Sequence, residues 1–126
     1  VKEILEVTVD AFSDDDVGEA IRVEPLRELI NVLCNELKSR HITRLRNGKC
    51  ELKQGFAFNN ILTDFERIGA HCSNVAVALL ESEAEDFDTH EYQKSIREMN
   101  NVMYRELYEA YELKYDISKT KKAKKK

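Results

Sequence analysis

The stretch FAFNNILTDFERIGAHCSNVAVALLE, residues 56–81, decides the fold. Apolar side chains recur in it at alternating spacings of three and four residues, which is the pattern of a helix packed against neighbouring helices along its length. The residues of this core seam are Phe58, Ile61, Phe65, Ile68, Cys72, Val75 and Leu79. We therefore predict a central helix here that buries the core seam.

A polar stripe runs beside the core seam on the same predicted helix. Its residues are Asn60, Asp64, Arg67, His71 and Asn74. At a spacing of three residues, Asp64 can pair with Arg67. A solvated flank is the simplest interpretation of this stripe, and a functional polar surface is the alternative.

Composition favours helices in the rest of the chain as well. The 126 residues include one proline and four glycines, and 35% of them are charged while 42% are hydrophobic. This mixture suits amphipathic helices, whereas a β-sandwich needs more turn residues. The length is sufficient for one domain with a core of its own.

Breaks in the pattern divide the remaining sequence into further helices. Residues 1–12 favour a helix, and the run at 13–16 stops it and starts the next. This second helix covers about residues 15–46, with a kink or a restart at Pro25, because proline removes a backbone donor. Asn47-Gly48 supplies a left-handed stop, and the third helix begins near residue 50 or 51.

The acidic residues 81–87 are weakly periodic and favour a loop. The segment Asp88-Thr89-His90-Glu91 resembles a capping box, and a fourth amphipathic helix follows it. Three long helices and one shorter helix, joined by short loops, predict an all-α fold, an antiparallel helical bundle. We assign residues 1–118 to this bundle domain and residues 119–126 to a basic tail.

Charge is segregated between the bundle and the tail. The formal net charge is −4, but the last eight residues hold six lysines and no acid. Without them, 14 basic residues face 24 acidic ones, a balance of −10. An acidic body repels nucleic acid, so no nucleic-acid partner is expected. The lysine tail is either a solvated end or a contact for anionic lipid.

Three cysteines, Cys34, Cys50 and Cys72, form no CxxC pair, which is typical of reduced cytosolic thiols. The sequence contains no window of about 18 apolar residues and no signal peptide. Because the chain opens on valine inside a helical pattern, we expect it to be a fragment of a longer protein.

Catalytic signatures are lacking in the sequence, so we predict that the protein is not an enzyme. Neither a Gly-x-Ser-x-Gly motif nor a glycine-rich phosphate loop occurs. A zinc site is not supported either, since the adjacent His71 and Cys72 point about 100° apart on a helix and Cys34 and His41 lie two turns apart. A site for a hard cation is the alternative, built from Asp64 and Glu66 with Glu24 and Glu28 of the second helix.

The third helix resembles a known family. Its segments Gly-Phe-Ala-Phe-Asn-Asn at 55–60 and Asp-Phe-Glu-Arg-Ile-Gly-Ala-His-Cys-Ser-Asn-Val-Ala at 64–76 look like the signature helix of the PhoU family. Three further segments, at 23–26, 36–42 and 87–92, make the resemblance closest to the cytoplasmic PhoU-like domain of bacterial sodium/phosphate cotransporters. The resemblance covers roughly residues 5–117.

This resemblance implies a three-helix unit with an additional closing helix and no catalysis. It implies a cytosolic regulatory domain that tunes phosphate uptake from the cytoplasmic side of the plasma membrane, as part of a membrane protein. The membrane domain of the same transporter would be its partner, and a homodimer would supply the second bundle that free-standing PhoU proteins carry. The alternatives are a free-standing PhoU-type regulator of phosphate transport and signalling, and a metal-binding helical protein.

The resemblance also implies a divalent or iron-type metal ion, because PhoU proteins bind metal through Glu/Asp-x-x-x-Asp motifs on the signature helix. Here the motif falls on Glu66 and position 70, which is Ala70, so the second carboxylate is missing. Asn60 and Asn31 also stand where the family usually has aspartate. Neutral amides attract a hard cation less than carboxylates do. The metal candidates that remain are Glu66, Asp64, Glu24 and Glu28.

Overall fold

A computed structural model describes residues 1–86 and 90–118, with the backbone alone described for 83–86 and 90–100. Its helices are α1 (Lys2–Asp14), α2 (Val17–Ile21), α3 (Val23–Arg46), α4 (Leu52–Asp86) and α5 (His90–Lys114). No strand occurs in the part of the chain that is described. The predicted all-α bundle is therefore confirmed.

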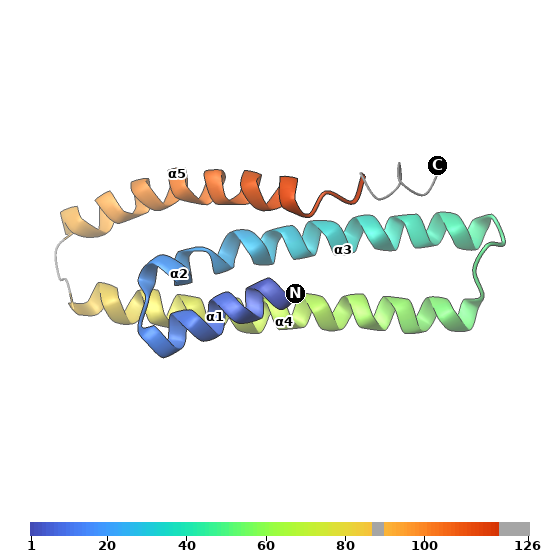
Figure 1. The fold of residues 1–126 in the computed structure, drawn as a ribbon, viewed down its shortest axis with the longest axis horizontal. Coiled ribbons are helices and arrows are strands. Elements are labelled where there is room, and N and C mark those ends of the chain that lie inside the picture. The colour runs from blue at the N-terminus through green and yellow to red at the C-terminus, as the bar shows by residue number, and fades with distance from the viewer. Residues whose placement is uncertain (87–89, 119–126) are drawn as a thin grey trace.

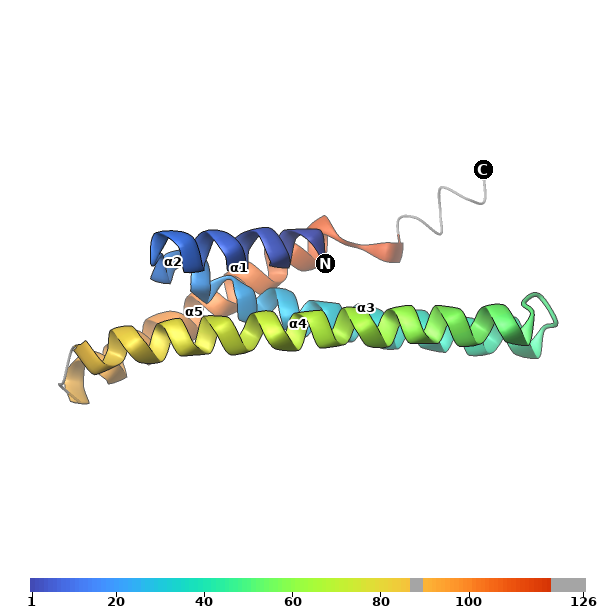
Figure 2. The same cartoon turned by 90° about the horizontal axis from the view of Figure 1, so that it is seen from below.

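Helices α3 and α4 form an antiparallel hairpin, and the other elements are arranged around the half of the hairpin that lies away from its connecting turn (Figure 1). Helix α5 lies along α3 and runs antiparallel to α4. Helices α1 and α2 lie on one face of the α3–α4 pair, and α1 contacts both of these helices (Figure 2). The turn between α3 and α4 therefore lies at the end of the molecule that α1 does not reach.

The chain turns from α1 into α3 through the short helix α2. Asp15 adopts a left-handed conformation with φ of 49° and ends α1, and the Asp16 carboxylate accepts a hydrogen bond from the Glu19 amide at 3.3 Å. Helix α3 then starts at Val23, so Pro25 sits in its first turn, where proline is tolerated. Of the two predicted outcomes at Pro25, the structure shows the restart.

The sequence predicts the turn before α4 correctly, but it does not predict where α4 ends. Gly48 has φ of 66°, which confirms the left-handed stop after α3. At the other end, α4 continues to Asp86, so the loop predicted at 81–87 is wrong over 81–86. Glutamate and alanine, which make up most of 81–86, are good helix formers, and the helix propagates through them. Of the predicted capping box, Asp88 and Thr89 lie outside the described residues.

The core is built from one face of each of α1, α3 and α4, together with parts of α2 and α5. Its buried apolar residues are Ile4, Val7, Ala11, Ala20, Val23, Leu26, Leu29, Ile30, Cys34, Leu62, Cys72, Ala76 and Tyr111. Helix α1 thus buries residues at spacings of three and four, and it packs against both α3 and α4.

The predicted core seam of α4 differs from the face that is buried. Cys72 is buried, and Phe58, Ile68 and Leu79 pack against the core while partly exposed. The other three seam residues lie on the surface, with exposed fractions of 50% for Ile61, 36% for Phe65 and 36% for Val75. The prediction of an unbroken buried seam is therefore wrong at these three positions.

A neighbouring row that includes small residues is buried instead. Leu62, Gly69, Ser73 and Ala76 all face the interior of the bundle. Small side chains let helices approach closely, so this flank of α4 packs against its neighbours while the larger residues of the seam are pushed toward its edge. The five residues of the polar stripe are all exposed.

Two glycines of α4 provide a matched test of this packing. A Cβ at Gly69 would meet its nearest neighbour, Cγ of Arg27, at 3.6 Å, an ordinary contact. Gly69→Ala should therefore stabilise the protein by about 1 kcal/mol through helix propensity. A Cβ at Gly55 would lie 2.5 Å from Nε2 of the buried His41, so Gly55→Ala should destabilise it by about 1–3 kcal/mol. Urea unfolding measures both, and equal effects would contradict the packing at Gly55.

Candidate functional site

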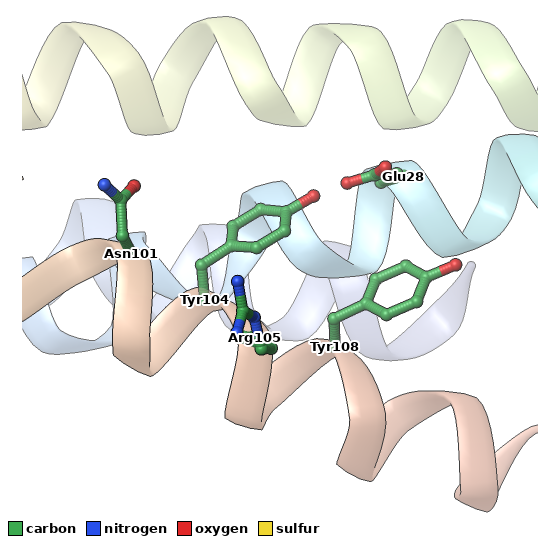
Figure 3. Close-up of a pocket in the computed structure, with 5 residues that line it drawn as sticks. All are labelled: Glu28, Asn101, Tyr104, Arg105 and Tyr108. Atoms are coloured by element: carbon green, nitrogen blue, oxygen red, sulfur yellow. The ribbon is translucent and has the colours of Figure 1, made fainter.

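Two neighbouring pockets lie where α5 meets the rest of the bundle. The larger has a volume of about 410 Å³ and is lined by Glu28 of α3 and by Asn101, Tyr104, Arg105 and Tyr108 of α5 (Figure 3). The smaller, of about 190 Å³, shares Asn101 and Tyr104 with it and is otherwise lined by Ala20, Ile21, Glu24, Ala76, Val77 and Leu80. Helix α5 therefore supplies the residues that both pockets share.

Two tyrosines and a glutamate shape the larger pocket. The rings of Tyr104 and Tyr108 are nearly parallel, at 9°, with their centroids 6.4 Å apart. Both hydroxyl groups point toward α3, where Glu28 lies (Figure 3). Burial raises the pKa of Tyr108, and the negative charges of Glu112 and Glu28 add to this effect. The pocket therefore places the phenol of Tyr108 near the side chain of Glu28.

One ion pair and one hydrogen bond already engage the carboxylate of Glu24. One oxygen lies 3.0 Å from Nη1 of Arg27, and the other accepts a 2.5 Å hydrogen bond from Ser73 Oγ. Ser73 itself is buried, so this contact ties α3 to α4. The Nε of Arg27 is buried without a hydrogen-bond partner among the described residues. Glu24 thus serves helix packing.

The four predicted metal candidates do not come together. Glu66 pairs with Lys38 at 2.9 Å across the α3–α4 interface, and Asp64 is exposed on another flank of α4. Glu24 lies against Ser73, which is seven residues, or roughly 10 Å, along α4 from Glu66. Among the residues whose side chains are described, 1–82 and 101–118, no group of three or more His, Cys, Asp or Glu residues is placed to hold a metal ion.

The residues present therefore do not fit the metal centre that the family resemblance implies. Ala70 supplies no ligand atom beside Glu66, and Lys38 already neutralises that carboxylate. Glu24 and Glu28 line different pockets. A hard cation needs several oxygen ligands converging on one point, and these side chains do not converge.

Polar contacts attach α5 to the N-terminal part of the chain. Nε of Arg22 donates to the Tyr111 hydroxyl at 2.9 Å, while Nη1 of Arg22 pairs with Glu19 at 3.1 Å. Burial opposes the charge of Arg22, but the hydrogen bonds to Tyr111 and Glu19 outweigh it, so the pKa of Arg22 is raised. These contacts hold α5 in the position that forms both pockets.

A second attachment lies at the opposite end of α1. Both oxygens of the Glu3 carboxylate are used, one by the Lys114 ammonium at 2.5 Å and the other by the Tyr115 hydroxyl at 3.1 Å. The hydrogen bond to Glu3 raises the pKa of Lys114, and the charge of Glu3 adds to the effect.

One constellation that sequence reasoning missed lies at the turn between α3 and α4. Sγ of Cys50 lies 3.8 Å from Nδ1 of His41, although the two residues are nine positions apart. Cys50 lies only two residues beyond the Asn47-Gly48 turn, which reverses the chain direction. Pairing residues across that turn was the signal that could have identified the contact.

Apolar residues are also exposed along α1. Val1, Leu5, Val9 and Phe12 recur at spacings of four, four and three, so they share the side of α1 that faces away from its buried residues. Val9 and Phe12 are 60% and 67% exposed.

In the described part of the chain, no helix combines the length and the apolar character that crossing a membrane requires. Neither the comparison with curated proteins nor that with solved structures gave a significant match.

The comparison with protein families matched the PhoU domain over residues 1–79. This range covers α1, α2, α3 and most of α4, and it ends before α5. More than half of the chain lies within the match, including the whole of α1, α2 and α3 and most of α4. The chain belongs to the PhoU family.

Proposed function

We propose that this chain is the cytosolic regulatory domain of a sodium/phosphate cotransporter and that it tunes phosphate uptake without catalysis. PhoU domains are linked to the regulation of phosphate transport, and proteins of the family are regulatory rather than catalytic. In this proposal the domain lies on the cytoplasmic side of the plasma membrane, attached to the membrane part of the same protein.

The observation that carries the proposal is the relation of α5 to the family match. The matched residues form the α1–α4 unit, and α5 is fixed onto it through Arg22–Tyr111 and through Glu3 with Lys114 and Tyr115. A PhoU unit with an added closing helix is the arrangement that the resemblance to cotransporter domains implies. The transporter-like segment at 36–42 lies in the second half of α3.

Regulation in this proposal works through binding. The membrane domain of the transporter is the main partner, and a second copy of this chain would supply the second bundle. The lysine-rich residues 119–126, which lie outside the described residues, would contact anionic lipid through charge, at about 1 kcal/mol per lysine near the surface.

The sequence encoded upstream of Val1 in the same reading frame distinguishes the proposal from its alternative. We expect membrane-spanning segments to be encoded upstream of Val1. A frame without such segments, encoding a second PhoU bundle, would support a free-standing regulator of phosphate transport and signalling instead. Sequencing the complete gene and its transcript decides between them.

A further inference from the structure

The turn between α3 and α4 brings a thiol and an imidazole together. Cys50 lies between Gly48 and the start of α4 at Leu52, and its Sγ is 3.8 Å from Nδ1 of His41 on α3. The Cys50 side chain is half-buried, so reagents can reach the sulfur from solvent. Figure 1 shows this turn at the end of the hairpin, away from α1.

The His41 imidazole is held in a fixed orientation. The residue is only 7% exposed, and its ring contacts that of Phe58 with centroids 5.2 Å apart. Its Nε2 side faces Gly55 so closely that a Cβ there would lie 2.5 Å away. The guanidinium of Arg44 covers the Phe58 ring at 5.6 Å from its centroid. Among the described residues, the Cys50 thiol is the polar group within reach of the ring.

The surroundings of Cys50 are mostly cationic. The thiol lies just before the N-terminus of the 35-residue helix α4, which carries a partial positive charge. The charged residues in the last turn of α3, the connecting turn and the first turn of α4 are Arg44, Arg46, Lys49, Glu51 and Lys53. Four of these five are cations. The backbone carbonyl of Glu51 accepts from the neutral thiol at 3.5 Å.

The other two cysteines provide internal controls. Cys34 is buried, and its thiol donates to the Leu62 carbonyl at 3.7 Å. Burial raises the pKa of Cys34, and the charge of Glu66 adds to this effect. Cys72 is buried as well. Of the three thiols, Cys50 alone combines access to solvent with a neighbouring base.

We propose that Cys50 is a thiol-modification site that forms mixed disulfides with low-molecular-weight disulfides and that His41 accepts its proton. The thiol proton passes to Nδ1 of His41, and the thiolate attacks one sulfur of the disulfide. The sulfur–sulfur bond of the reagent breaks as the new bond to Cys50 forms. The departing thiolate takes the proton from the imidazolium and leaves as a thiol, so the low-molecular-weight disulfide is the oxidant. The modification places a new group at the tip of the α3–α4 hairpin.

The test uses the folded protein and oxidised glutathione, with the site of modification followed by mass spectrometry. At pH 7 we expect Cys50 to react at least about tenfold faster than Cys34 or Cys72. A peptide spanning residues 47–53 has the same thiol without His41, and Cys50 in the protein should exceed it by about tenfold. A rate equal to or below that of the peptide would overturn the proposal.

The variant His41→Gln separates the imidazole's role from packing. Glutamine fills similar space but cannot take a proton near neutrality. We expect the rate at pH 7 to fall about tenfold and the rate–pH profile to lose its imidazole-dependent limb, with circular dichroism unchanged. An unchanged rate and profile in a folded variant would refute the role of His41. If the variant does not fold, the comparison with the peptide still decides the proposal.

Discussion

Replacing Ile4 with aspartate should unfold the bundle or detach α1 from it. Ile4 is fully buried, with an exposed fraction of 0%, in the core that α1 shares with α3 and α4. A carboxylate there has no cation to pair with inside the core, and burying an unpaired charge is among the most destabilising of changes. We expect a loss of more than about 4 kcal/mol in the free energy of unfolding. Thermal melting followed by circular dichroism measures it.

The control for this variant is Val9→Asp on the same helix. Val9 is 60% exposed, so its replacement introduces the same charge into solvent. We expect a change within about 0.5–1 kcal/mol, as for other surface substitutions. If Val9→Asp were the more damaging of the two, α1 would present its other face to the core.

Leu62→Ala is the second change for which we expect a large effect. Leu62 is 3% exposed and packs between α4 and α3, where the thiol of Cys34 donates to its carbonyl. Truncating a buried leucine removes apolar contacts and leaves a cavity, at a cost of about 2–5 kcal/mol. Urea unfolding should show a lower midpoint with the same dependence on denaturant.

Its neighbour Ile61 supplies the control. Ile61 belongs to the predicted core seam but is 50% exposed in the folded chain. Ile61→Ala removes a similar number of atoms and should cost less than about 1 kcal/mol. A larger loss for Ile61 than for Leu62 would show that the predicted seam, and not the row containing Leu62, faces the core.

Local signals were sufficient for the fold class and for most helix ends. Pro25 and Gly48 act through backbone geometry, which depends little on tertiary contacts, so an interruption near Pro25 and the stop at Gly48 were predictable. The sequence left open whether the helix kinks or restarts at Pro25. The loop expected at 81–87 is wrong over 81–86, because the helix propensity of glutamate and alanine extends α4 through a weakly amphipathic segment.

Which face of α4 is buried was not predictable from the sequence in the same way. Periodicity identifies which residues share a face, but the large residues of the seam compete with a neighbouring flank that carries Gly69, Ser73 and Ala76. Close packing against α3 selects the flank with small side chains, and that choice depends on partner helices that the pattern of one helix does not specify.

At the candidate site, too, local sequence identifies residue types but not their partners in the fold. The sequence identifies the acidic residues that could bind a cation, but it does not show their partners. Lys38 pairs with Glu66 and Ser73 donates to Glu24, and in each case the partner lies on another helix. These cross-helix partners convert predicted ligands into packing contacts. The contact between His41 and Cys50 was easier to predict from the sequence, because a single turn separates the two residues.

Initial rates of sodium-driven phosphate uptake test the proposed function most directly. The measurement compares vesicles or cells that contain the complete transporter with those in which residues 1–118 are deleted, at equal surface abundance. The variant Ile4→Asp, which disrupts the bundle without shortening the chain, serves as a second comparison. We expect both changes to raise uptake at high internal phosphate, where a regulatory domain restrains transport. Uptake that is unchanged in both, with the deletion confirmed, would contradict the proposed regulatory role.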